Sequence, residues 1–271
     1  MKTILVPTDF SECADNALEF AISVAKINDS EIIVLSSYYI PSSGGVGAMR
    51  NLQENLRKET EIQLLNLLEK KKAKYPFLKV KSYTDFNVPS SSIIRFVNNL
   101  DVDLVVMGTT GASGVKEVLM GSTTSVIIDK VSVPIFAIHK ETSFDILNKI
   151  SIATDLSGLK DLKSMKRVKI ISDILNFKIE FLSIYTEMTE KLKKQIELKK
   201  ERMNEIFGEE NYTLNLIKSD DIENAILDNV EENSILAVVS RSRGFFEKLF
   251  HSSMSKKLSM HSKNPILVLH D

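Results

Sequence analysis

The sequence predicts an α/β fold in which two doubly wound parallel-sheet domains follow one another in a single chain. One observation is that short apolar runs alternate with amphipathic, helix-periodic segments along the 271 residues. Strict strand–helix alternation is typical of a parallel sheet with right-handed crossovers. The other observation is that motifs of the first half return in the second half, which predicts two copies of one domain.

Three short strings carry the repeat, and they recur in the same order. The pairs are ILVPTDFS (4–11) with ISIATDLS (150–157), VLSSYY (34–39) with FLSIYT (181–186), and VPIFAIH (133–139) with NPILVLH (264–270). Because three ordered matches are hard to explain by chance, we place the domains at 1–140 and 148–271. A Gly/Ser-rich stretch at 41–50 of the first domain has no counterpart in the second.

The elements of the first domain follow from the periodicity of its apolar residues. Continuous apolar runs predict strands, because a parallel sheet is covered on both faces. Apolar residues at three- and four-residue spacing predict helices, and Pro89 followed by serines is a helix-start signal. The predicted strands are 4–8, 31–38, 80–85, 103–108 and 135–139, and the predicted helices are 12–27, 49–73, 89–99 and 122–131.

Composition narrows the class of protein. With 43% hydrophobic and 26% charged residues, the chain is typical of a soluble globular protein. A net charge of −1 provides no large field to attract nucleic acid or an anionic membrane, and no apolar run is long enough to span a bilayer. The single cysteine, Cys13, and a start that reads as a strand rather than a signal peptide predict a cytoplasmic protein.

A glycine-rich segment after the fourth predicted strand is the main candidate for binding chemistry. Four of the ten glycines fall in GTTGASGVKEVLMGS, at Gly108, Gly111, Gly114 and Gly121. Ligands bind beyond the carboxyl ends of strands in open α/β sheets. Glycines there let the backbone approach a ligand, and a helix N-terminus attracts anions. Ser122 is placed both to cap the following helix and to donate to a phosphate.

Asp9 is a second candidate, because it follows the first predicted strand. Its carboxylate can accept hydrogen bonds from ribose hydroxyls. The alternative is that Asp9 or Ser11 caps the helix beginning at residue 12. Both roles stay open at this point, and one side chain can serve both. The loop itself is neither a P-loop nor a GxGxxG motif, since neither pattern occurs in the expected place.

The spacing Gly108-x2-Gly111-x9-Gly121-Ser122, followed by a last strand with Pro134, resembles the signature of the universal stress protein family. The opening VPTDFS resembles that family's first strand, and the resemblance covers the whole chain as a tandem pair. It implies the adenine nucleotide alpha hydrolase-like fold and ATP binding. It implies that phosphates and ribose contact Gly108, Gly111, Gly121, Ser122 and Thr123, that Asp9 binds the ribose, and that Pro7, Thr8, Ser37 and Met107 border adenine. Ser37 departs from the small apolar residue often found there in the family.

The second domain departs from the signature. Its corresponding segment, 238–258, has Ser252 where the first domain has Gly121 and no glycine near the position of Gly108. A Cβ there takes space that a phosphate needs, so we expect no ATP site of the family type in this domain. The basic residues Arg241, Arg243 and His251 leave open another anion site or, alternatively, a solvated loop.

These observations predict a cytoplasmic regulatory protein of the stress response that binds ATP, with Mg²⁺, in its first domain. AMP and ADP are alternative ligands. We expect no catalytic residue and no metal-ligating side chains, because the histidine spacing is not of the zinc type and the loop lacks an arginine finger. Two other functions stay open: a slow ATPase using Lys116, Glu117 or Ser122, and a nucleotide-free scaffold for protein contacts.

The expected partners follow from the same arguments. They are an adenine nucleotide and an unidentified protein, with no nucleic acid and no membrane. The family resemblance also implies pairing through the last strand. We therefore expect the two domains to form an intrachain pseudo-dimer, and the sequence leaves further association into a homodimer open.

Overall fold

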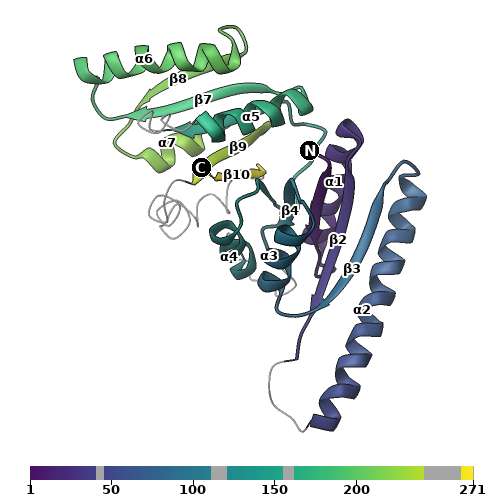
Figure 1. Ribbon diagram of the computed structural model, residues 1–271. Helices are drawn as coiled ribbons and strands as arrows, with labels where there is room; N and C mark the ends of the chain where they lie inside the picture. Colours follow the sequence, from purple (N-terminus) through teal and green to yellow (C-terminus); the bar gives the residue numbers. More distant parts are fainter. Residues whose placement is uncertain (41–45, 111–120, 155–161, 241–263, 271) are drawn as a thin grey trace. The chain divides into compact units, whose positions relative to one another are not determined.

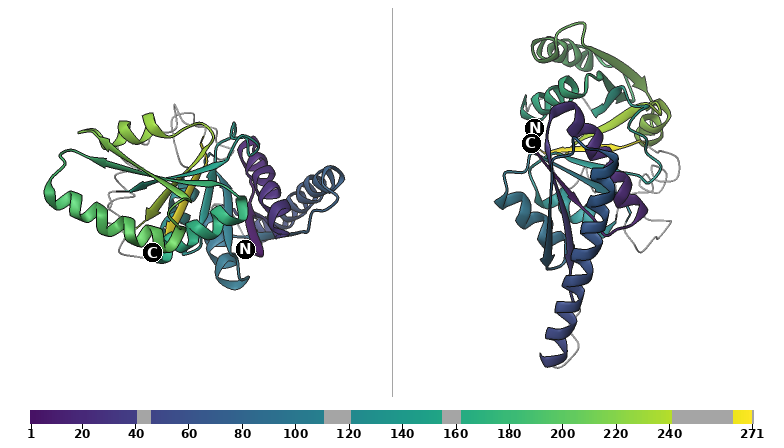
Figure 2. Two further views of the ribbon diagram at one scale, coloured as in Figure 1. Left: turned by 90° about the horizontal axis from the view of Figure 1, so that it is seen from above. Right: turned by 90° about the vertical axis from the view of Figure 1, so that its right-hand side faces the viewer.

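The structure is a computed structural model, and it describes residues 1–40, 46–110, 121–154, 162–240 and 264–270 (Figures 1 and 2). The chain divides into two compact units. The N-terminal unit contains the described residues up to Glu141, and the C-terminal unit contains those from Thr142 onward. Each unit is an α/β structure with a parallel sheet.

The N-terminal unit has the strand order β3-β2-β1-β4-β5, with every pair parallel. The strands are β1 (Thr3–Pro7), β2 (Glu31–Tyr38), β3 (Val80–Phe86), β4 (Leu104–Gly108) and β5 (Ile135–Ile138). The helices are α1 (Glu12–Asn28), α2 (Val46–Lys74), α3 (Pro89–Asn99) and α4 (Ser122–Lys130). The predicted elements of this unit are confirmed, and their bounds differ most at α2, which begins at Val46 rather than 49.

The helices cover both faces of this sheet, as right-handed crossovers require. Helices α1 and α2 lie on one face, and α3 and α4 pack on each other on the opposite face (Figures 1 and 2). Because both faces are covered, the central strands are apolar on both sides; Ile4, Leu5 and Val6 of β1 are all fully buried. Strands β2 and β3 lie on one side of β1, and β4 and β5 lie on the other side, so the strand order reverses beside β1 and a crevice opens at the carboxyl ends of these strands.

The C-terminal unit has the strand order β8-β7-β6-β9-β10, again parallel throughout. Its strands are β6 (Lys149–Thr154), β7 (Lys178–Tyr185), β8 (Tyr212–Lys218), β9 (Ser234–Ser240) and β10 (Ile266–His270). Its described helices are α5 (Leu162–Leu175), α6 (Glu190–Phe207) and α7 (Ile222–Asn229). In chain order, the strands therefore take the same places in the sheet as those of the N-terminal unit.

Local features also recur between the units. The carbonyls of Pro134 and Pro265 each accept a backbone hydrogen bond from the neighbouring fourth strand of their unit, at 3.0 and 2.9 Å. The residues that follow α1 and α5, Asp29 and Asn176, both have left-handed backbones with φ of 52° and 56°. This correspondence is consistent with the predicted duplication. Within the described part of the chain, no helix combines the length and apolar character that a membrane span requires.

Candidate functional site

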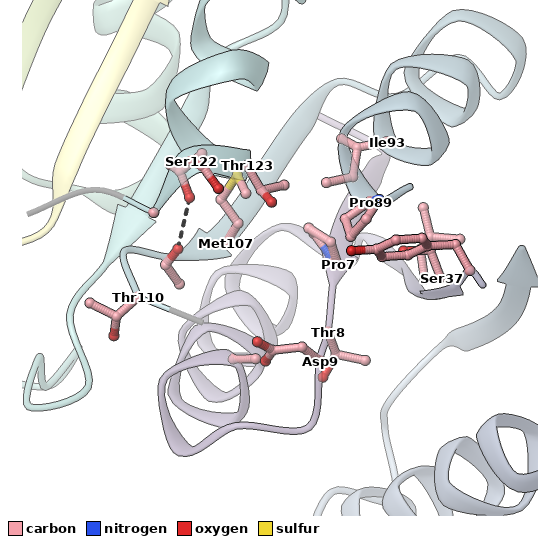
Figure 3. Close-up of a pocket in the computed structure, with 16 residues that line it drawn as sticks. Pro7, Thr8, Asp9, Ser37, Pro89, Ile93, Met107, Thr110, Ser122 and Thr123 are labelled. Atoms are coloured by element: carbon pink, nitrogen blue, oxygen red, sulfur yellow. Dashed lines mark hydrogen bonds between the residues drawn. The ribbon is translucent and has the colours of Figure 1, made fainter. Parts of the chain in front are cut away.

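A cavity of about 430 Å³ lies at the carboxyl ends of β1, β2 and β4 in the N-terminal unit (Figure 3). Its volume is in the range of small-molecule sites. Most of the predicted site residues line it, namely Pro7, Thr8, Asp9, Ser37, Met107, Gly108, Gly121, Ser122 and Thr123. The remaining one, Gly111, lies outside the described residues. The structure thus brings residues from the beginning of the unit's sequence together with residues from near its end.

Other residues, which the sequence does not indicate, also line the cavity. They are Ala14, Leu35, Tyr39, Pro89, Ile93, Thr110 and Thr124. Pro89 and Ile93 come from the first turns of α3, one helical turn apart, so both face the same side of that helix. The helix-start signal at Pro89 locates this turn in the sequence, but nothing in the sequence indicates that it reaches the end of β1.

The two ends of the cavity differ in chemistry. Pro7, Pro89 and Ile93 lie together with Ser37 at one end, which is mainly apolar (Figure 3). Ser122 lies with Thr123 and Thr110 toward the other end, which offers hydroxyl groups and the start of α4. An apolar body with a few convergent polar groups is the usual character of a small-molecule site.

The turn after β1 places Asp9 at the cavity. Ser11 is the N-cap of α1, and its hydroxyl accepts a hydrogen bond from the N–H of Ala14 at 3.2 Å. Asp9 holds the preceding turn, because its Oδ1 accepts from the N–H of Ser11 at 3.1 Å. Phe10 between them has φ of 63°, and its N–H donates to Thr8 Oγ1 at 3.0 Å. Of the two candidates for the helix cap, the structure assigns Ser11 to that role.

Gly108, the last residue of β4, lacks a side chain because α1 passes close to it. A Cβ at this position would lie 2.9 Å from Cys13 Sγ and 3.2 Å from the Cys13 backbone carbon. Its carbonyl accepts a hydrogen bond from Thr124 Oγ1 at 3.1 Å, which ties the end of β4 to the first turn of α4. Packing within the protein is therefore sufficient to explain this glycine.

Gly121 is different, because the described part of the protein does not require a glycine there. Its φ of −53° and ψ of 151° suit any residue. A Cβ would meet Thr109 O at 3.5 Å, an ordinary van der Waals distance. The expectation that Ser122 caps α4 is wrong: Gly121 is the N-cap, Ser122 is the first helical residue, and no side chain caps the helix through a hydrogen bond. The missing side chain leaves the helix N-terminus accessible from the cavity.

The start of α4 is suited to an anion. The first backbone N–H groups of a helix have no partner in its own ladder and carry a partial positive charge. Here those groups belong to Ser122, Thr123 and Thr124, all of which line the cavity, and the first turn has no acidic residue. Among the described lining residues, Asp9 is the only charged one. Of the described lining residues at this end, those that could hold an anion therefore do so through N–H and hydroxyl groups.

Several sequence predictions concern residues that the structure does not describe. Lys116 and Glu117, the residues suspected of ATPase activity, are among them. So are Arg241, Arg243, His251 and Ser252 of the second domain. Within the described ranges, no group of three or more histidine, cysteine, aspartate or glutamate side chains could hold a metal ion.

Comparisons with known proteins agree with the fold. The model of the universal stress protein family matches residues 1–139. Two universal stress proteins of Methanocaldococcus jannaschii are similar: one is 30% identical over 51% of this chain and 82% of the relative, and the other 27% identical over 52% and 97%. The crystal structure of a universal stress protein from Archaeoglobus fulgidus is similar over 99% of this chain and 98% of that chain, with a TM-score of 0.70 and 20% identity.

Proposed function

We propose that this chain, which belongs to the universal stress protein family, binds an adenine nucleotide in the cavity of its N-terminal unit. The observation that carries the proposal is the pairing of two features in one cavity of nucleotide size. One end is apolar, as a base requires, and the other presents a helix N-terminus without a covering side chain. The adenine nucleotide alpha hydrolase-like fold, predicted from the sequence, is confirmed.

The base fits the apolar end. Pro7, Pro89 and Ile93 provide apolar surface there, and Ser37 provides one hydroxyl. Because β1 and β2 end at this place, backbone groups beyond their last ladder bonds are available to the edge of a base. Thr8 still donates its N–H to Leu35 O at 2.8 Å, so the backbone there is fixed by the sheet.

The ribose and phosphates fit the polar end. Asp9, which lines the cavity, would accept hydrogen bonds from ribose hydroxyls. The N–H groups at the start of α4 and the hydroxyls of Ser122 and Thr123 would receive a phosphate. A Mg²⁺ ion would be bound mainly by phosphate oxygens and water, as is usual for this ion, and supplies charge neutralisation when present. ATP is our proposed ligand; ADP and AMP share the same base and sugar.

We propose a regulatory role in the cytoplasm rather than substrate turnover. The described lining residues include no lysine, arginine or histidine that could stabilise a transferring phosphoryl group or move a proton. A bound nucleotide would instead change the surface near the carboxyl ends of the strands. We propose that a protein partner reads this surface.

The test compares the wild-type protein with Gly121→Ser in thermal unfolding with and without ATP and Mg²⁺. Wild type should be stabilised, by about 2.7 kcal/mol at a hundredfold excess over Kd. The serine is a good N-cap and the backbone angles suit it, so the unliganded variant should melt no lower than wild type. Its side chain would occupy the phosphate end, so the ligand-induced rise should be lost. An unchanged melting temperature of the wild-type protein in millimolar ATP and Mg²⁺ would overturn the proposal.

A further inference from the structure

Tyr39 lines the proposed nucleotide cavity, and its contacts with the other described residues do not explain why an aromatic residue stands there. It lines the cavity next to the end of β2, yet half of its surface (50%) is exposed. Within the described part of the chain, its ring stacks on no other aromatic ring and its hydroxyl makes no hydrogen bond. A large aromatic side chain that is exposed in a cavity, and that packing does not explain, is available to a ligand.

The strand geometry places this ring at the base end of the cavity. Side chains alternate along β2, and Tyr38 faces away from the cavity, where its ring packs on Phe86 with 5.6 Å between the centroids. Ser37 and Tyr39 both line the cavity on the other side. Ser37 lies beside Pro7 and Pro89 at the apolar end (Figure 3). Tyr39 therefore extends from the same strand end that borders the proposed base position.

The repeat gives an independent comparison. In the matched strings VLSSYY and FLSIYT, Thr186 of the C-terminal unit takes the place of Tyr39, and Ile184 takes the place of Ser37. Tyr38, which packs on Phe86, is matched by Tyr185, so an aromatic residue recurs at that position. The unpaired aromatic residue is thus present only in the half that keeps the glycine signature.

We propose that Tyr39 stacks on the base of the bound nucleotide and makes the site prefer purine nucleotides over pyrimidine nucleotides. This inference rests on the proposed function. Aromatic side chains stack on any base, and a purine, with two rings, offers the larger face. The aliphatic residues of the cavity would cover one face of the base, and the tyrosine ring would cover the face that is open to solvent.

The experiment measures ATP and UTP binding by calorimetry for wild type, Tyr39→Ala and Tyr39→Phe. Tyr39→Ala should weaken ATP binding by about tenfold or more and UTP binding by less, while Tyr39→Phe should stay close to wild type because it keeps the ring. Since Tyr39 is half-exposed, neither variant should lower the melting temperature of the unliganded protein by much.

The outcomes separate this inference from the proposed function. If wild type binds ATP and the affinity of Tyr39→Ala for ATP is within twofold of wild type, the stacking role is wrong. The proposed nucleotide site is then unaffected. Equal weakening of ATP and UTP would also overturn the purine preference. If wild type does not bind ATP, the proposed function fails, and this inference fails with it.

Discussion

At the residue scale, Gly108 and Gly121 belong to one sequence signature but lack side chains for different reasons. At Gly108 the reason is internal, since a Cβ would collide with Cys13 of α1. At Gly121 the described structure leaves room for a Cβ and imposes no special backbone angle. A glycine signature can therefore combine a packing requirement with a binding requirement. The surroundings of each glycine in the folded chain distinguish the two requirements.

This distinction predicts that Gly108→Ala destabilises the unliganded protein. The new Cβ would lie 2.9 Å from Cys13 Sγ and 3.2–3.3 Å from Cys13 backbone atoms, so α1 must shift. We expect a loss of about 1–3 kcal/mol in the free energy of unfolding, as is usual for overpacking. Urea unfolding monitored by circular dichroism measures this loss.

Cys13→Ala provides the matched control. It removes the Sγ contact and keeps the backbone contacts. The loss in the free energy of unfolding should therefore be smaller for the double variant than the sum of the losses for the two single variants. If Gly108→Ala unfolds at the same urea concentration as wild type, α1 does not restrict this position. The glycine would then have to be explained by the ligand, as at Gly121.

At the element scale, an ion cluster around the buried Lys71 joins α1 to the carboxyl-terminal half of α2. The ammonium of Lys71, whose side chain is only 8% exposed, lies 2.7 Å from Asp15 and 2.5 Å from Glu19. Tyr75 and Lys74 also donate to Glu19. Burial raises the pKa of Glu19, but the hydrogen bonds from Lys71, Tyr75 and Lys74 together outweigh it and leave the pKa lowered. The ionised form of Glu19 therefore stabilises the folded protein.

Glu19→Gln should lower the free energy of unfolding at pH 7, by about 1–2 kcal/mol for lost hydrogen bonds to a charged group. A group whose pKa is lower in the folded state stabilises that state fully above its unfolded pKa, and this contribution is lost as the pH falls through the folded value. The difference between wild type and variant should therefore shrink below about pH 4.5. Urea unfolding at a series of pH values measures this difference.

Glu69→Gln, a charge removal on the exposed side of α2, is the control and should have little effect at any pH. A difference for Glu19→Gln that stays constant down to pH 3 would show that Glu19 acts through shape rather than charge.

The elements themselves were largely predictable, because strand and helix periodicity are local properties. Ser11 also has the expected cap chemistry in the sequence, although only the structure decides between it and Asp9. The wall formed by Pro89, Ile93 and Tyr39 could not be predicted. Its position depends on how α3 and the end of β2 fold over the end of β1, and neither periodicity nor the glycine signature carries that information.

At the scale of the whole molecule, the two units share a strand order but differ at the proposed site. The C-terminal half has Thr186 for Tyr39 and Ser252 for Gly121. Both are sequence differences at positions that the proposed nucleotide site uses, Tyr39 for a stacking ring and Gly121 for an uncovered helix start. A duplicated fold would thus hold one nucleotide site of this type per chain.

This asymmetry predicts that the full chain binds one ATP. Calorimetry of the wild-type protein should give a stoichiometry of one per chain, and Gly121→Ser should remove the whole binding signal rather than half of it. Any site that Ser252→Gly adds should bind ATP about tenfold or more weakly than the first, because the C-terminal half would still have Thr186 in place of the tyrosine. Two equivalent sites in wild type, or a residual site of equal affinity in Gly121→Ser, would show that the C-terminal half also binds ATP. The loss of the glycine signature would then have left nucleotide binding intact, and the assignment of Gly121 to the phosphate would have to be abandoned.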